Sequence, residues 1–125
     1  MEVWQTAREL TRLIYDLTHN ERFSRDFGLS NQLRRAFVSI MSNIAEGFES
    51  RTNVLFKDFL GRAKASASEL RAQVYIAKDI EYITENDFSQ LIGLCIKCSR
   101  QISRFIQYLE KQPNAIRDEV IEYNV

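Results

Sequence analysis

The fold is decided by residues 53–80, which read NVLFKDFLGRAKASASELRAQVYIAKDI. Apolar residues recur there in alternating steps of four and three, at Phe56, Leu60, Ala63, Ala67, Leu70, Val74 and Ala77. This repeat places them on one stripe of an α-helix, a seam like that of a coiled coil. At 1.5 Å per residue the helix is roughly 42 Å long. Thr52 precedes it and is the expected N-cap.

Three other stretches, about residues 2–18, 30–48 and 85–111, have the same helical period. Their inner stripes are Val3, Ala7, Leu10, Ile14 and Leu17; Leu33, Phe37, Ile40, Ile44 and Phe48; and Phe88, Leu91, Cys95, Cys98, Ile102, Phe105 and Leu109. These stretches predict three further amphipathic helices.

Signals for the ends of these helices lie where the periodicity stops. We expect Ser30 and Thr84 to be N-caps, because a hydroxyl accepts a hydrogen bond from a free backbone N–H of the first turn. Gly47 is expected to leave its helix in a left-handed conformation. Pro113 stops the last helix.

The short connections favour antiparallel neighbours. The sequence therefore predicts an all-α fold, an antiparallel up-down-up-down four-helix bundle over residues 1–112. Residues 113–125 form a tail with Ile116, Val120, Ile121, Tyr123 and Val125. The tail is expected either to form a short docking helix or to remain mobile.

Composition narrows the class of protein. The chain has 125 residues, enough for one domain, and 17 basic residues balance 17 acidic ones. The first residues lack the basic start and apolar run of a signal peptide. The longest apolar run, residues 91–96, is far shorter than the roughly 20 residues that span a bilayer. We expect a cytoplasmic protein.

Residues that carry chemistry are scarce. Cys95 and Cys98 match C-x-x-C, but both fall in mid-helix on the inner stripe, where core packing is the expected role. His19 is the single histidine, so one chain cannot supply the four ligands of a zinc site. All the glycines are separate, so a phosphate-binding loop is missing. The sequence predicts no catalytic activity, no cofactor and no metal.

Basic residues are ordered rather than scattered. Lys57, Lys64, Arg71 and Lys78 recur every seven residues, and a second short stripe holds Lys97, Arg100 and Arg104. One interpretation is that they flank an apolar seam, pair with acids across it and keep the bundle in solution. The other is a surface that binds phosphates of RNA.

The apolar arcs of the last two helices are wider than a lone bundle needs. The residues outside the inner stripes are Leu55, Phe59, Tyr75, Ile76, Ile92, Leu94, Ile96 and Ile106. Exposed together they would form a larger patch than monomers usually carry, so we expect a homo-oligomer.

The run Ser42-Asn43-Ile44-Ala45-Glu46-Gly47-Phe48, preceded by residues 30–41, strongly resembles a four-helix-bundle family, the ribosomal-RNA intervening-sequence proteins. Trp4-Gln5 and Phe59-Leu60 also match, and the resemblance covers roughly residues 3 to 110. It implies a ring-like homopentamer. It also implies a relationship to the accessory variability protein of diversity-generating retroelements, which binds a reverse transcriptase and nucleic acid through a strongly basic surface.

Five residues of the resembling stretch are candidate functional positions: Arg35, Ser42, Asn43, Glu46 and Gly47. Asn43 and Glu46 are three apart on one helical face. We expect structural roles. Asn43 is expected to form a hydrogen bond with the turn after Gly47, and Glu46 is expected to pair with Arg35 or with a basic residue on another helix. A ligand-binding cleft is the alternative.

The function that these features predict is a non-enzymatic oligomeric scaffold. Its expected partner is RNA or an RNA-protein complex, bound through the two basic stripes. The alternative is a protein–protein adaptor that does not bind nucleic acid.

Overall fold

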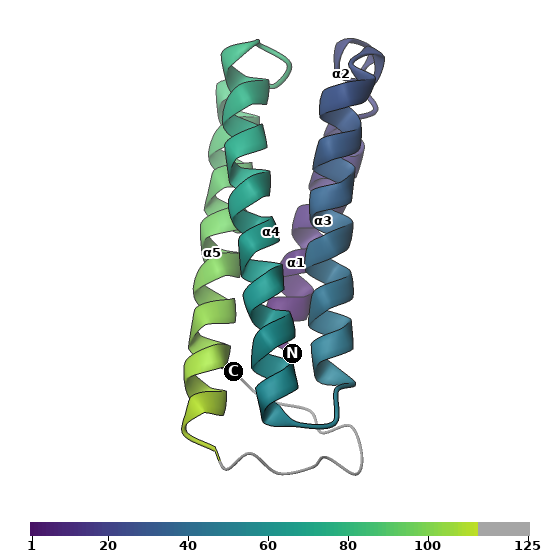
Figure 1. Ribbon diagram of the computed structural model, residues 1–125. Coiled ribbons are helices and arrows are strands. Elements are labelled where there is room, and N and C mark those ends of the chain that lie inside the picture. Colours follow the sequence, from purple (N-terminus) through teal and green to yellow (C-terminus); the bar gives the residue numbers. More distant parts are fainter. Residues whose placement is uncertain (113–125) are drawn as a thin grey trace.

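The computed structural model of the protein describes residues 1–112 (Figure 1). Its helices are α1 (Glu2–Leu17), α2 (Glu21–Arg25), α3 (Phe27–Phe48), α4 (Asn53–Asp79) and α5 (Glu85–Glu110). The all-α prediction is confirmed, and the bounds of the four long helices lie within three residues of the predicted ones. The predictions for residues 113–125 fall outside the described residues.

The four long helices pack side by side around one core (Figure 1). α3 lies between α1 and α4, and α5 also contacts both α1 and α4. The inner stripes predicted from the sequence supply most of the core: Phe56, Leu60, Leu70, Cys98, Ile102 and Phe105 have no exposed surface. The heptad-like spacing therefore fixes which side of each helix faces inward.

Two of the predicted N-caps are confirmed. Thr52 Oγ1 accepts a hydrogen bond from the backbone N–H of Leu55, and Thr84 Oγ1 accepts one from that of Asp87, at 3.1 and 3.0 Å. Each bond satisfies one of the free N–H groups of a first helical turn. These caps set the starts of α4 and α5.

The prediction that Ser30 caps the second helix is wrong. α3 begins at Phe27, one turn earlier, and its cap is Asp26, whose carboxylate accepts from the N–H of Leu29 at 3.0 Å. Ser30 lies inside the helix, where its buried hydroxyl donates to the carbonyl of Phe23 at 2.7 Å. The hydroxyl thus holds the preceding segment rather than a helix end.

That preceding segment is α2, which the sequence analysis did not predict. Asn20 caps it, and Phe23 projects into the core. α2 also contacts the α4–α5 connection, because Asn20 and Arg22 donate to the carbonyls of Tyr82 and Glu81. The Tyr82 hydroxyl in turn donates to Asp26 Oδ2 at 3.0 Å. We call these contacts the α2 clasp.

Gly47 does not leave the helix in a left-handed conformation, so that prediction is also wrong. It lies in the last turn of α3, and none of the described glycines has a positive φ. A Cβ atom on residue 47 would lie 2.9 Å from Phe56 Cδ1 and 3.1 Å from Phe59 Cβ. Glycine is therefore required here for close packing of α3 against α4.

The apolar arc is exposed on α4 but not on α5. Leu55, Tyr75 and Ile76 are exposed as predicted, whereas Ile92, Leu94 and Ile106 pack against the core. This corrects the expected arc of α5, a helix flanked by both α1 and α4.

None of the described helices is long and apolar enough to cross a membrane.

Candidate functional site

The predicted basic stripe of α5 lies on the outer surface of that helix. Lys97, Arg100 and Arg104 are exposed, and with Ile96 and Gln101 they line a shallow hollow of about 440 Å³. Gly93 lies at its end and leaves open space, since a Cβ atom there would meet nothing within 4 Å. The hollow is therefore bordered by three cations on successive turns.

The basic stripe of α4 runs along the edge that faces α5. Lys64 and Arg71 are exposed, and Lys57 is half-buried. The positive charge of Arg71 acts on the thiol of Cys95 in α5, which places the two residues near each other.

Lys78 differs from the other three lysines and arginines of this stripe. Its ammonium lies 3.3 Å from a carboxylate oxygen of Glu85 and 4.2 Å from the centre of the Phe88 ring. The predicted pairing with an acid across the seam therefore holds for Lys78, whose charge is compensated within the bundle.

Contacts between α4 and α5 fix which residues lie level with one another. Lys78 pairs with Glu85, and the rings of Tyr75 and Phe88 pack edge to face with 5.0 Å between their centres. Continuing this antiparallel register at 1.5 Å per residue places Lys64 level with Ser99, one residue before Arg100. We call Lys57, Lys64, Arg71, Lys97, Arg100 and Arg104 the basic face.

Acidic neighbours are few on this surface. α5 carries no acid between Asp87 and Glu110, and Asp58 of α4 is paired with Arg62 at 3.0 Å. Within residues 1–112, no residue of the basic face takes part in an ion pair. Six charges are thus left to solvent or to an anionic ligand.

Among the resembling residues, Asn43 holds a polar contact between two helices. Its amide donates to the backbone carbonyl of Ser39 at 2.8 Å and to Ser39 Oγ at 3.1 Å. Ser39 Oγ lies 2.7 Å from Ser66 Oγ of α4. The hydrogen-bond partner of Asn43 is therefore Ser39 and not the turn after Gly47.

Arg35, Ser42 and Glu46 lie on the exposed side of α3. Within the described part of the chain Glu46 makes no hydrogen bond or ion pair, so the expected partners Arg35 or a base of another helix are not found. Ser42 makes a long contact of 3.4 Å to the carbonyl of Ser39. Arg35 and Ser42 border a shallow depression of about 420 Å³ on the outside of α3.

Arg34 faces the bundle, unlike Arg35. Its guanidinium lies over the ring of Tyr15 at 5.4 Å and donates to Thr18 Oγ1 at 3.4 Å, both in or next to α1. Sequence periodicity could have separated the two arginines, because only Arg34 falls beside the inner stripe of α3.

The two cysteines serve the core, as predicted. Both are buried, and removal from water raises the pKa of Cys95 to about 12 and that of Cys98 to about 11. A reactive thiol needs a lowered pKa. The described residues also contain no group of three or more histidine, cysteine or carboxylate side chains that could hold a metal ion.

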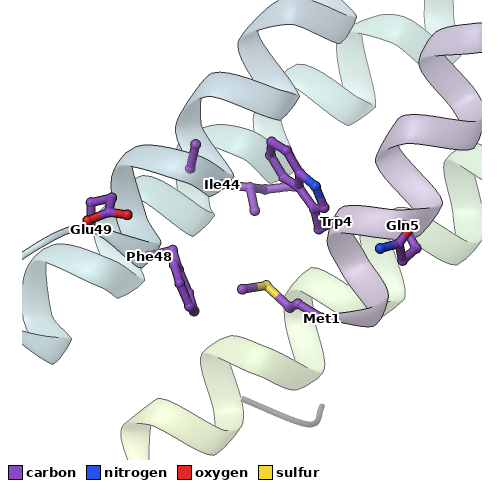
Figure 2. Close-up of a pocket in the computed structure, with 7 residues that line it drawn as sticks. Met1, Trp4, Gln5, Ile44, Phe48 and Glu49 are labelled. Carbon is purple, nitrogen blue, oxygen red and sulfur yellow. The ribbon is translucent and has the colours of Figure 1, made fainter. Parts of the chain in front are cut away.

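A cavity of about 510 Å³ opens between the start of α1 and the end of α3. Figure 2 shows Trp4, Phe48 and Met1 around the same open space, with Ile44 behind it and Glu49 at one side. We call this cavity the α1–α3 groove. The sequence alone does not reveal this groove, because its two walls are far apart in the chain.

The sequence model of the family described as 23S rRNA-intervening sequence protein matches residues 1–104. A search of curated proteins finds no relative of the chain.

A similar solved structure is a protein of unknown function from the S23 ribosomal protein family of Bacteroides thetaiotaomicron, at 1.70 Å resolution. It superposes with a TM-score of 0.77 and 23% identity over 84% of this chain and 98% of that one. At 23% identity, this similarity shows a shared fold and nothing more. The match over most of the chain shows that the protein belongs to the 23S rRNA-intervening sequence protein family.

Proposed function

We propose that this protein is a non-enzymatic cytoplasmic scaffold whose basic face binds phosphates of RNA. The observation that carries the proposal is the set of six cations without an ion pair, three on α4 and three on the outer surface of α5, on a chain whose net charge is zero. Charges without acidic partners are available for phosphate oxygens, and their binding releases counterions from the nucleic acid.

Self-association would bring several copies of the basic face together. The exposed apolar side chains of α4 support such self-association. Val54, Leu55, Tyr75 and Ile76 are each about half exposed on that helix. A second copy that covers them would remove apolar surface from water. The family resemblance implies a ring-like homopentamer, in which several basic faces would act on one RNA.

Binding of a structured RNA, followed by fluorescence anisotropy at several salt concentrations, tests the proposal. Engaging all six cations predicts a slope of up to about −5 for the logarithm of affinity against that of salt, by 0.9 per contact. The double reversal Lys64→Glu and Arg100→Glu should weaken binding about tenfold or more, because two phosphate contacts are lost. Each lost contact should also lower the salt slope by about 1.

A matched control is Arg8→Glu with Arg12→Glu, which makes the same charge change on exposed residues of α1. The control variant should bind the RNA more tightly than the double reversal on the basic face. Equal loss in both variants would mean that only total charge matters, and unchanged affinity in Lys64→Glu/Arg100→Glu would remove this face from the proposal.

A protein–protein adaptor is the second candidate, and the exposed apolar side chains of α4 favour it. Light scattering with and without RNA at low salt separates the two. A multimer whose mass grows with RNA supports the scaffold. A multimer that ignores RNA supports the adaptor, and then Ile76→Glu should abolish capture of the partner protein.

A further inference from the structure

The α1–α3 groove lies at the end of the bundle where the chain of α5 also finishes. α1 begins there, α3 ends there, and the antiparallel α5 ends at Glu110 at the same end (Figure 1). Neighbouring helix axes in a bundle are about 8–10 Å apart. The path from the end of α5 to the groove is therefore short.

The chain continues beyond the described residues for residues 113–125, which is enough to reach the groove. Fully extended, this segment spans about 43 Å at 3.3 Å per residue, and as a helix about 20 Å. Both lengths exceed the separation between neighbouring helices, so residues 113–125 are long enough to contact the α1–α3 groove.

The chemistry of the segment matches that of the groove. Ile116, Val120 and Tyr123 follow the spacing i, i+4, i+7, while Asp118 and Glu122 fall on the other side of that pattern. The groove offers Trp4, Ile44 and Phe48 as apolar walls. An aromatic and aliphatic groove favours an apolar stripe over water.

The shared bundle does not need this segment for its core. The family match ends at residue 104, and the structure from Bacteroides thetaiotaomicron is almost fully matched by 84% of this chain. Within α5, Phe105 and Leu109 are buried. Residues 116–123 thus lie beyond the part of the chain that the family model matches.

We propose that residues 116–123 bind in the α1–α3 groove of their own chain, with Ile116 and Val120 against Trp4 and Phe48. This contact goes beyond RNA binding, since it involves neither the basic face nor the exposed apolar residues of α4.

Trp4 is the single tryptophan and lines the groove, so its fluorescence reports the contact directly. The full chain carrying Ile116→Asn and Val120→Asn is compared with one carrying Arg117→Asn and Glu122→Asn, which alters the polar side and keeps the net charge. We expect Trp4 of the first variant to be quenched more by acrylamide and to emit at longer wavelength, with the control unchanged. A Trp4 signal that is the same in both variants overturns the proposal.

Oxidative cross-linking gives a second measurement that does not depend on fluorescence. Ala45→Cys in the groove is combined with Val120→Cys, and Gly61→Cys on the outside of α4 replaces Ala45→Cys in the control. The native thiols are buried and do not interfere. A disulfide within one chain, absent from the control, supports the proposal. A disulfide between two chains, or none, overturns it.

Discussion

Gly47 of α3 packs so closely on Phe56 of α4 that a Cβ atom on residue 47 would lie 2.9 Å from the ring carbon Cδ1. Real side-chain contacts do not come this close, and Phe56 is fully buried and edge-on to Phe48. The glycine therefore sets the separation between the end of α3 and the start of α4, two helices joined by a short connection.

Gly47→Ala should lower the free energy of unfolding by up to about 2 kcal/mol. Overpacking costs about 1–3 kcal/mol, and alanine's helix propensity offsets about 1 kcal/mol of that cost. Chemical denaturation measures the change. Gly61→Ala and Gly93→Ala are the controls, because both positions have open space and should gain up to about 1 kcal/mol each. A gain of the same size at Gly47 would contradict the steric account.

Ser66→Ala should cost about 1 kcal/mol relative to Ser68→Ala. Both changes remove a hydroxyl from α4 and gain the same helix propensity, but only Ser66 bonds another helix, through Ser39. The difference between the two melting curves therefore isolates the interhelical bond. Equal stability of the two variants would show that the Ser39–Ser66 contact contributes nothing.

Alkaline pH should weaken the α2 clasp through Tyr82. The hydrogen bond to Asp26 raises the pKa of Tyr82 above the ordinary value of 10.0, and burial adds to the shift. The folded chain therefore keeps the phenol proton more firmly, so this stabilisation is fully present below pH 10 and is lost as pH rises through the raised pKa.

The comparison that checks this pH dependence is the wild type against Tyr82→Phe. Below pH 10 the wild type should be the more stable, and above it the gap between their unfolding free energies should close. Cysteine ionisation affects both proteins alike and cancels in the difference. A gap that stays constant across the alkaline range would contradict the role of the Tyr82 proton.

Cys95 and Cys98 should resist thiol reagents at pH 8 until the bundle unfolds. With pKa values near 12 and 11 against an ordinary 9.0, the reactive thiolate is rarer by about a hundredfold to a thousandfold. Labelling followed by mass spectrometry across a denaturant series should track the unfolding transition. Rapid labelling of either thiol in the native state would be inconsistent with their burial.

Much of the fold follows from local patterns. The heptad-like stripe of α4 and the hydroxyls of Thr52 and Thr84 act within one or two helical turns, so the sequence alone predicts them. The prediction for Ser30 fails because Asp26 offers an equally good cap one turn earlier, and burial of Phe23 decides between the two. Burial of Phe23 depends on residues far along the chain.

The candidate site was predictable only in outline. The seven-residue spacing predicts the cations of α4, and a second short stripe predicts those of α5. Pairing of Lys78 depends on how the α4–α5 connection places Glu85. The exposed arc of α5 is smaller than predicted because Ile92, Leu94 and Ile106 pack against the core. The α1–α3 groove joins segments about 40 residues apart, and no local pattern describes its shape.

The basic face has a consequence for the molecule as a whole. Because 17 positive and 17 negative charges cancel, the excess of positive charge on one surface requires an equal negative excess on the others. Such a neutral molecule has an electric dipole. A distant polyanion therefore attracts the protein only weakly. Within a Debye length of about 8–10 Å, the electric field of the polyanion rotates the protein so that its basic face points toward the polyanion. This field changes the orientation in which the two molecules meet more than the rate at which they meet.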